Sequence, residues 1–338
     1  MNNLSNRQFR LLSRPVGHVL HSDFEYGASR VGRPALGQLL VQVHYLSLDP
    51  GMRGWMNAGE SYQPPVAIGE VMRAFGIGTV MESYSDRFSV GDVVVGLTGV
   101  QDYATADARM FTRVEPTLAT MPRFLGALGL SGMTAYFGLL DIGQPRPQDC
   151  LVVSAAAGAV GALVGQIGRI YGCRVIGIAG GERKCRYLQE ELGFDMAIDY
   201  RDGDLGRSLH AACPTGVDIF FDNVGGEILD QVLNRLAPKA RVIICGAVSQ
   251  YNCAKTAKGP ANYLSLVTNR ARMEGFLVFD YAARYGEAST ALAGWLNSGA
   301  LKAREHVISG LERFPDAFGR LFTGDHLGKL VLEVRPPG

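Results

Sequence analysis

Apolar and polar residues alternate in the first part of the chain, as they do in half-buried strands. The segment GQLLVQVHYLSLDP (37–50) alternates over most of its length and stops at Pro50. Two shorter apolar runs, GIGTVMES (76–83) and GDVVVGL (91–97), lie between turn residues. Short runs of this kind, separated by turn residues, are typical of strands. Residues 1–125 are therefore predicted to form a β-rich domain.

After residue 125 the pattern changes to strands that alternate with helices. The segment 124–143 has apolar residues at helical spacing. Strand-like runs separated by helical segments follow it: CLVVSAA (150–156), CRVIGIAG (173–180), MAIDY (196–200), VDIFFDNVGG (217–226) and ARVIICGAV (240–248). Such alternation requires crossover connections, so a parallel sheet is expected. The run RMEGFLVFD (272–280) is a candidate for one more strand.

The chain ends with two more strand-like runs, HVISGLE (306–312) and GKLVLEVR (328–335). We expect the last strand to return to the first domain. The predicted architecture is an α/β domain, residues 126–304, inserted between two parts, 1–125 and 305–338, of a β-rich domain. A length of 338 residues with 47% hydrophobic content is sufficient for two cores.

The turn after the first strand of the α/β domain resembles a dinucleotide-binding turn. Its spacing is that of G-x-G-x-x-G, with Ala156, Gly158 and Gly161 at the three positions. Ala156 can make the bend at negative φ, Gly158 lets backbone approach a pyrophosphate, and Gly161 lets the helix pack on the strand. The phosphates would lie at the helix N-terminus. The strand–turn–helix–strand context favours nucleotide binding over a merely structural turn.

The segment after the second strand, IAGGERK (178–184), bears on the choice between NAD and NADP. An NAD site needs an acidic residue there for the ribose 2′-hydroxyl. Glu182 is displaced beyond two glycines, and Arg183 and Lys184 supply positive charge for a 2′-phosphate. The alternative is that these are ordinary solvated residues at the start of a helix. The sequence favours NADP.

Charge and hydropathy exclude some partners. A net charge of +1 gives no reason to expect nucleic acid or an anionic membrane as a partner. No apolar run is long enough to span a bilayer, and the first residues have no apolar signal-peptide region. We therefore expect a soluble, cytoplasmic protein without nucleic-acid or membrane partners.

The cysteines and histidines predict no metal site. The six cysteines include no C-x-x-C pair and none lies before residue 150, so they are interpreted as reduced, mostly buried thiols. The six histidines form no H-E-x-x-H motif or Cys–His cluster. His18 and His21 are close in sequence but have no further ligand nearby, and loop or surface histidines are the simpler explanation.

The chain resembles a known family nearly from end to end, the zinc-independent branch of the medium-chain dehydrogenase/reductases. Within that branch it is similar to the leukotriene B4 dehydrogenases, prostaglandin reductases, plant double-bond reductases and bacterial curcumin reductases. The segments that carry the resemblance are LSLDPGMRGWM (46–56), SYQPPVAIGEVM (61–72), LGLSGMTAYFGLLDIG (128–143), SAAAGAVGALVGQIG (154–168), GERKCRYLQEELGFDMAIDY (181–200), DIFFDNVGGEILD (218–230), ICGAVSQYN (244–252), RMEGFLV (272–278) and GDHLGKLV (324–331).

The resemblance implies a fold and a reaction. The fold is a Rossmann doubly wound parallel sheet (126–304) with a β-rich GroES-like domain (1–125 and 305–338). The reaction is the NADPH-dependent reduction of the carbon–carbon double bond of α,β-unsaturated ketones and aldehydes, by hydride transfer to the β-carbon. A homodimer is implied as well. Zinc-dependent relatives carry a Cys ligand in the region SLDPGMR and Gly-His-Glu in the region IGEVM, and both are absent here.

The resemblance also implies site residues. Tyr251 is the candidate catalytic hydroxyl, although a core or capping tyrosine is the alternative for this residue. Three residues are candidates for the substrate pocket: Tyr62, Gly51 and Met133. The candidate cofactor-binding residues are Gly158, Ala159, Val160, Gly161, Lys184, Tyr200, Asn223, Cys245, Gly246, Ala247, Ser249, Tyr251, Phe276, Leu277, Val278 and His326.

Two of these residues differ from the family pattern. Gly51 stands where the family commonly has tyrosine, which is expected to widen or reshape the pocket. His326 stands where the family commonly has asparagine, and its charge depends on pH. Two alternative functions are open at this point: an NADPH-dependent quinone reductase, and a non-catalytic NADPH-binding protein.

Overall fold

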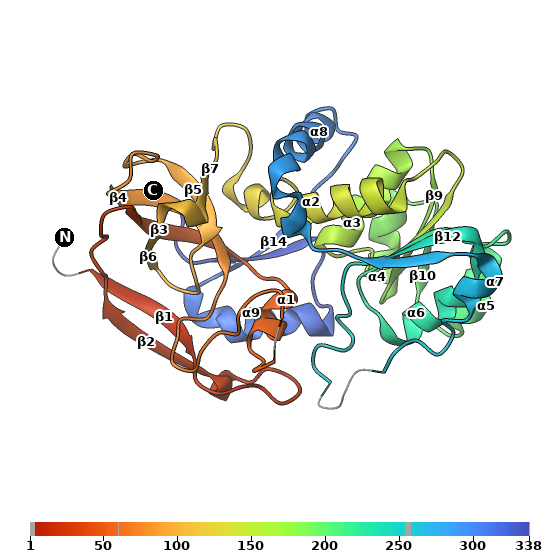
Figure 1. Cartoon of the computed structure of the whole chain (residues 1–338), viewed down its shortest axis with the longest axis horizontal. Helices are drawn as coiled ribbons and strands as arrows, with labels where there is room; N and C mark the ends of the chain where they lie inside the picture. Colours follow the sequence, from red (N-terminus) through yellow and green to blue (C-terminus); the bar gives the residue numbers. More distant parts are fainter. Residues whose placement is uncertain (1–3, 60, 254–257, 338) are drawn as a thin grey trace. The chain divides into compact units, whose positions relative to one another are not determined.

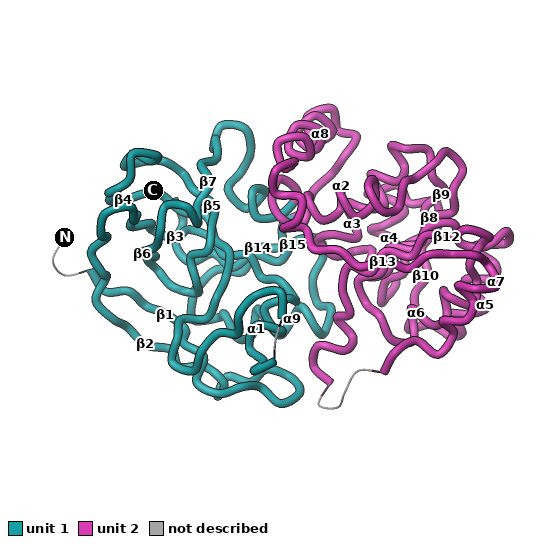
Figure 2. Tube along the Cα trace, in the orientation of Figure 1, with its two compact units in different colours: residues 1–126, 305–338 teal, residues 127–304 magenta. Residues whose placement is uncertain are grey.

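The computed structural model describes residues 4–59, 61–253 and 258–337. The chain forms two compact units: unit 1 comprises residues 1–126 with 305–338, and unit 2 comprises residues 127–304 (Figure 2). Unit 1 is therefore built from the two ends of the chain, with unit 2 inserted between them. Each unit has its own sheet and core and is described by itself below.

Unit 1 contains, among its described residues, a two-stranded and a seven-stranded sheet (Figure 1). The small sheet pairs β1 (Ser5–Leu11) with β2 (Phe24–Arg30). The large sheet has the order β14-β15-β3-β4-β5-β7, and β6 also pairs with β3. Its strands are β3 (Gln38–Ser47), β4 (Phe75–Ser83), β5 (Val93–Leu97), β6 (Tyr103–Asp107), β7 (Phe111–Arg113), β14 (Glu305–Ser309) and β15 (Lys329–Glu333).

The C-terminal strand returns to the first domain, as predicted from the sequence. β15 pairs antiparallel with β3, with Leu332 opposite Leu46, and parallel with β14. The helical elements of unit 1 are η1 (His21–Asp23), α1 (Gly51–Trp55), η2 (Ala108–Met110), η3 (Met121–Leu125), η7 (Leu311–Arg313) and α9 (Phe314–Thr323). The aromatic side chains of Phe314 and Phe318 on α9 are buried in the same core as Phe9 and Phe24.

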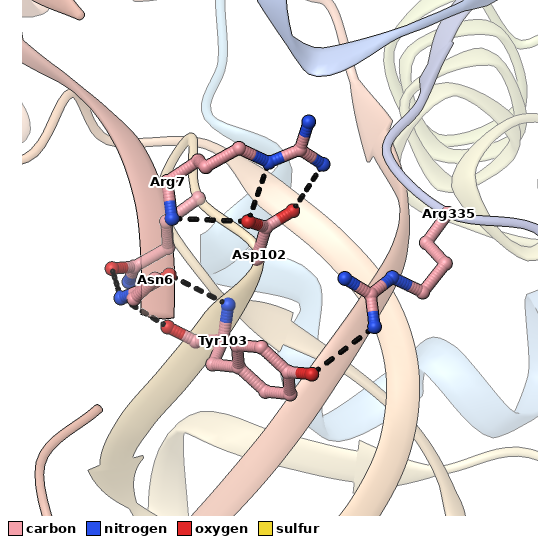
Figure 3. A network of polar contacts seen from close by, with 6 residues as sticks. Asn6, Arg7, Asp102, Tyr103 and Arg335 are labelled. Carbon is pink, nitrogen blue, oxygen red and sulfur yellow. Dashed lines mark hydrogen bonds and ion pairs between the residues drawn. The ribbon is translucent and has the colours of Figure 1, made fainter. Parts of the chain in front are cut away.

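A polar network ties the N-terminal strand to β6 and to the C-terminal segment (Figure 3). The Arg7 guanidinium donates to both carboxylate oxygens of Asp102, each at 2.9 Å, and the Arg7 backbone N–H adds a third bond of 3.0 Å. Asn6 exchanges hydrogen bonds with the backbone of Tyr103, whose hydroxyl accepts from Arg335 at 3.1 Å. Because the Asp102 side chain is only 2% exposed, its charge needs these donors.

Unit 2 has a six-stranded parallel sheet in its described part, with the order β10-β9-β8-β11-β12-β13. Numbered along the unit, this is 3-2-1-4-5-6, the order of a doubly wound dinucleotide-binding sheet. The predicted parallel sheet is therefore confirmed. Its strands are β8 (Cys150–Ser154), β9 (Arg174–Ala179), β10 (Met196–Asp199), β11 (Val217–Asp222), β12 (Leu236–Ile244) and β13 (Arg272–Gly275).

Helices cover both faces of this sheet: α2, α3 and α8 gather on one side in Figure 1, and α5, α6 and α7 on the other. The helical elements are α2 (Leu130–Phe137), η4 (Gly138–Gly143), α3 (Ala159–Ile170), α4 (Glu182–Arg186), η5 (Tyr187–Glu191), α5 (Leu205–Ala212), α6 (Gly226–Leu233), α7 (Ser265–Asn269), η6 (Val278–Arg284) and α8 (Tyr285–Asn297). Such a sheet, buried on both faces, explains why its strands are continuous apolar runs.

Two predicted elements are shorter than the sequence pattern indicated. The candidate strand at 272–280 ends at Gly275, and the Phe276 ring that follows packs against Phe221, with ring centroids 6.5 Å apart. The helical segment at 124–143 is divided into η3, α2 and the π-turn η4.

Candidate functional site

The glycine turn between β8 and α3 contains a left-handed residue that the sequence did not indicate. Ala155 has φ 47° and is the left-handed residue, whereas Ala156 lies outside that region, and its N–H donates to Ile178 O at 3.1 Å. Ala156 thus has the backbone conformation that the sequence analysis required of it, and Ala155 is the left-handed residue of the same turn. A methyl-bearing residue at positive φ is strained, and such strain is concentrated at functional turns.

Gly161 and Gly158 allow helix α3 to approach this turn. A Cβ on Gly161 would lie 2.5 Å from Ala155 O and 2.8 Å from Ala156 Cα, so that a larger residue would collide with backbone. A Cβ on Gly158, which caps the helix, would lie 3.2 Å from Ala155 O. The amino end of the 12-residue helix, with Ala159 and Val160 in its first turn, consequently lies at the carboxyl edge of the sheet. Its dipole and N–H groups favour an anion there.

A buried carboxylate joins three segments at this edge. Asp222, at the end of β11, accepts from the Ser154 hydroxyl at 2.8 Å and from the backbone N–H groups of Val224 and Gly225 at 3.0 Å. Its backbone oxygen accepts from Cys245 N at 2.9 Å. Burial raises the pKa of Asp222, while these N–H and hydroxyl donors lower it. Ser154 and Asp222 lie at the strand pair where the sheet order reverses, which is the ligand position in such folds.

Asn223 is held directly by this network. Its backbone N–H donates to the Ser154 hydroxyl and its side-chain amide donates to Ser154 O, both at 2.8 Å. Sequence reasoning singled out Asn223 but missed Ser154 and Asp222. The available signal was a polar residue at the last position of each of two buried, mainly apolar strands: Ser154 in β8 and Asp222 in β11.

Tyr251 folds back over the segment that follows β12. Its hydroxyl accepts a hydrogen bond from Ala247 N–H at 3.2 Å and lies 3.0 Å from where a Cβ on Gly246 would be. Ser249 anchors the same segment by donating its hydroxyl to Val224 O at 2.6 Å. The structure therefore brings Cys245, Gly246, Ala247, Ser249 and Tyr251 together beside the Asn223 loop. Burial, followed by the nearby Asp222, raises the pKa of Cys245 to about 12, so its thiol is protonated at neutral pH.

Lys184 and Tyr200 follow the carboxyl ends of two neighbouring strands, β9 and β10. Tyr200 follows β10 and donates its N–H to Ala179 O at 3.1 Å, while Lys184 lies on α4, just after β9. The acidic residue of this segment, Glu182, pairs with Arg186 at 3.7 Å. The Glu182 carboxylate therefore pairs within helix α4, and the same helix carries the basic residues Arg183 and Lys184 just after β9.

The remaining candidates of unit 2 are mainly packing residues. Met133 is 3% exposed, and the Phe276 ring lies so close to Gly138 that a Cβ there would be 2.6 Å from it. Leu277 is exposed, and Val278 accepts from the Tyr285 hydroxyl at 2.9 Å through its backbone oxygen. These contacts give Met133 and Phe276 a clear role in the core of unit 2.

Three candidates, Gly51, Tyr62 and His326, belong to unit 1. A Cβ on Gly51 would lie 3.0 Å from the Tyr62 hydroxyl. Tyr62 therefore approaches the position where the family commonly has tyrosine, and the prediction that glycine there widens or reshapes the pocket stays a prediction. A ring nitrogen of His326 lies 3.2 Å from Arg320 O.

The loop before Gly51 rests on a buried lysine that sequence reasoning missed. Lys329 bonds through its ammonium group to Leu48 O at 2.9 Å and to Asp49 at 2.5 Å. Asp49 also accepts from the Ser47 hydroxyl at 2.5 Å. The carboxylate in the region where zinc-dependent relatives carry a Cys ligand is thus held by Lys329. Among the residues that the structure describes, no three His, Cys, Asp or Glu side chains are grouped to hold a metal.

The cysteines are free thiols. Three of them, Cys150, Cys173 and Cys213, are buried, two are half-buried and Cys253 is exposed. Within the described ranges no helix is both long and apolar enough to cross a membrane.

Comparison with known proteins identifies the family. Residues 7–114 match the family described as the N-terminal domain of oxidoreductase, and residues 159–294 match the family described as zinc-binding dehydrogenase. These two matches define the class as medium-chain dehydrogenase/reductase. The chain belongs to the group of NADP-dependent oxidoreductases in this superfamily that includes the curcumin, 2-alkenal and prostaglandin reductases.

Several relatives match over nearly their full length. The NADPH-dependent curcumin reductase of Escherichia coli is 41% identical, covering 97% of both chains. The NADP-dependent 2-alkenal reductase of Nicotiana tabacum is 37% identical, covering 98% of both. The crystal structure of CurA from Vibrio vulnificus in complex with NADPH has 44% identity and a TM-score of 0.93, covering 98% of this chain and 100% of that one.

Proposed function

We propose that this protein is an NADPH-dependent reductase of the carbon–carbon double bond in α,β-unsaturated ketones and aldehydes. The observation that carries the proposal is the Tyr251 hydroxyl, held by backbone next to the Asn223 loop. The names of the relatives support it, since a curcumin reductase and a 2-alkenal reductase are 41% and 37% identical to the chain. Both names refer to compounds that contain a double bond conjugated to a carbonyl.

The carboxyl edge of unit 2 fits a dinucleotide. Gly161 is a position where a Cβ would collide with backbone, and the amino end of α3 favours the pyrophosphate. Asn223 and the segment from Cys245 to Ser249 would lie along the nicotinamide side, and Lys184 with Tyr200 at the 2′-phosphate. When bound, NADPH supplies the hydride that reduces the β-carbon.

Tyr251 is proposed to donate a hydrogen bond to the carbonyl oxygen of the substrate. That oxygen gains enolate charge as the β-carbon is reduced, and without a metal the charge needs a donor. The hydroxyl already accepts from Ala247 N–H, and a hydroxyl polarised in this way is a stronger donor. One such donor contributes about 3–4 kcal/mol to transition-state stabilisation. Solvent supplies the proton to the α-carbon, either directly or through the same hydroxyl, which solvent then reprotonates.

The test of this function is NADPH oxidation with a panel of acceptors. We expect turnover of a linear enone, a 2-alkenal and a dienone such as curcumin, with NADPH preferred over NADH and no effect of a chelator. Turnover of a quinone alone would replace the proposal by quinone reduction. Tight NADPH binding without oxidation by any acceptor would make the protein a non-catalytic NADPH binder.

We also propose that the chain forms a homodimer through the β13 edge of unit 2. In the described sheet β13 has β12 on one side and no strand on the other, and all four of its residues are exposed. β13 itself contains the exposed Met273, and three more exposed apolar residues lie near it in the sequence: Leu264, Val267 and Leu277. An open edge strand with an apolar surface is a template for pairing with a second chain.

The dimer proposal predicts that the protein has twice the chain mass in analytical ultracentrifugation and that Val267→Glu shifts it towards the monomer. The carboxylate would be buried unpaired in the interface. Val90→Glu, at a valine of similar exposure in unit 1, is the matched control and should leave the mass unchanged. A wild-type protein that sediments as a monomer would exclude the dimer.

A further inference from the structure

Arg201 lies at the carboxyl edge of unit 2, at a position to which no role has been given so far. β9 and β10 run parallel, with Ala179 opposite Asp199, so that Gly180 and Arg201 leave the sheet close together. The end of the second strand, here β9, is where dinucleotide-binding folds meet the adenosine ribose. Arg201 is therefore next to the point at which NADP and NAD differ.

The Arg201 side chain is held over the end of β9. A Cβ on Gly180 would lie 2.8 Å from Arg201 Nε and 2.9 Å from Tyr200 Cε1. The guanidinium carbon lies 5.7 Å from the centre of the Tyr200 ring, within range of a cation–π interaction. The Arg201 N–H also donates to Asp199 Oδ1 at 3.0 Å, which fixes the turn after β10. These contacts bring the guanidinium and Tyr200 together against Gly180.

The charges around this position suit a phosphate better than a diol. Glu182, the residue that could bind a ribose diol, pairs with Arg186 instead. Lys184 belongs to the same short segment after β9. A guanidinium offers a planar pair of donors that matches a phosphate group, and an ammonium adds a second positive charge.

We propose that Arg201 binds the 2′-phosphate of NADPH together with Lys184 and so sets the preference for NADPH over NADH. This inference rests on the cofactor part of the proposed function, and it adds a specificity-determining residue. It makes no use of the substrate, so a nucleotide fragment can test it without turnover.

The experiment is calorimetric titration of the full-length protein with 2′,5′-ADP and with 5′-ADP. Loss of a charge-assisted hydrogen bond in Arg201→Ala should weaken 2′,5′-ADP binding about tenfold or more, and 5′-ADP binding by less than about twofold. Arg201→Lys keeps the charge but loses the paired donors. Its affinity for 2′,5′-ADP should therefore lie between those of the wild-type protein and Arg201→Ala. Arg207→Ala, at an exposed arginine on α5 of the same unit, controls for net charge and should change neither affinity.

A second variant tests the position without removing charge. Gly180 has no positive φ, so alanine is compatible with its backbone, but the added methyl must displace Arg201 and Tyr200. Gly180→Ala should also weaken 2′,5′-ADP binding selectively. Equal loss of both nucleotides in Arg201→Ala, or no loss, would overturn the role of Arg201. If the wild-type protein binds neither nucleotide, the cofactor proposal fails, and this inference fails with it.

Discussion

Replacing Tyr251 by phenylalanine should lower kcat by about 10²–10³-fold, because it removes the one hydroxyl proposed to face the enolate oxygen. The ring is retained, so the segment from Cys245 to Ser249 keeps its packing, although Ala247 N–H loses its acceptor. NADPH affinity should therefore change little. The measurement is steady-state NADPH oxidation with a saturating enone, together with NADPH binding followed by fluorescence.

Tyr263→Phe is the matched control for Tyr251→Phe. Tyr263 is an exposed tyrosine of the same unit, and its loss of a hydroxyl should leave kcat unchanged. Undiminished turnover in Tyr251→Phe would remove this residue from the mechanism. Parallel loss of turnover and NADPH affinity would make Tyr251 a positioning residue for the 245–249 segment instead of the donor.

The substitution Gly161→Ala should weaken NADPH binding at least tenfold and lower the free energy of unfolding by about 1–3 kcal/mol. Its Cβ would lie 2.5 Å from Ala155 O, and this neighbour is backbone that cannot rotate away. Helix α3 must then move from the turn, taking its amino end away from the pyrophosphate position. NADPH titration and urea denaturation measure the two effects.

Gly294→Ala provides the control for the glycine substitution. Gly294 lies within helix α8 of the same unit, with open space around the added methyl. Alanine there should stabilise the helix slightly and leave NADPH binding unchanged. If Gly161→Ala bound NADPH as tightly as the wild-type protein does, the close approach of α3 to the turn would be unnecessary for cofactor binding.

Hydrophobic periodicity was sufficient to predict the sheet of unit 2, because buried parallel strands are continuous apolar runs separated by helices. It also predicted the return of the last strand to the first domain, where β15 pairs with β3. It could not place the bend of the turn, because three consecutive alanines carry no signal for which of them takes positive φ. The structure assigns that conformation to Ala155.

Site residues could be predicted where their role depends on local sequence spacing. Residues whose role depends on contacts between distant parts of the chain were missed. Gly158 and Gly161 follow from spacing alone. The bond between Ser154 and Asp222 joins residues 68 positions apart, and Lys329 reaches Asp49 across 280 positions. The approach of Tyr62 to Gly51 depends on the path of a loop, which residue pattern does not encode.

The insertion of unit 2 into unit 1 has a consequence for the order of folding on the ribosome. At ~5–20 residues per second, synthesis of residues 127–304 takes roughly 10–40 s. During that interval β3 lacks its neighbour β15, and the apolar core around Phe9 lacks Phe314 and Phe318 of α9. Unit 2 can complete its own sheet in the meantime. The nascent N-terminal segment therefore presents an open strand edge to chaperones, and loss of the last strand would damage unit 1 and spare unit 2.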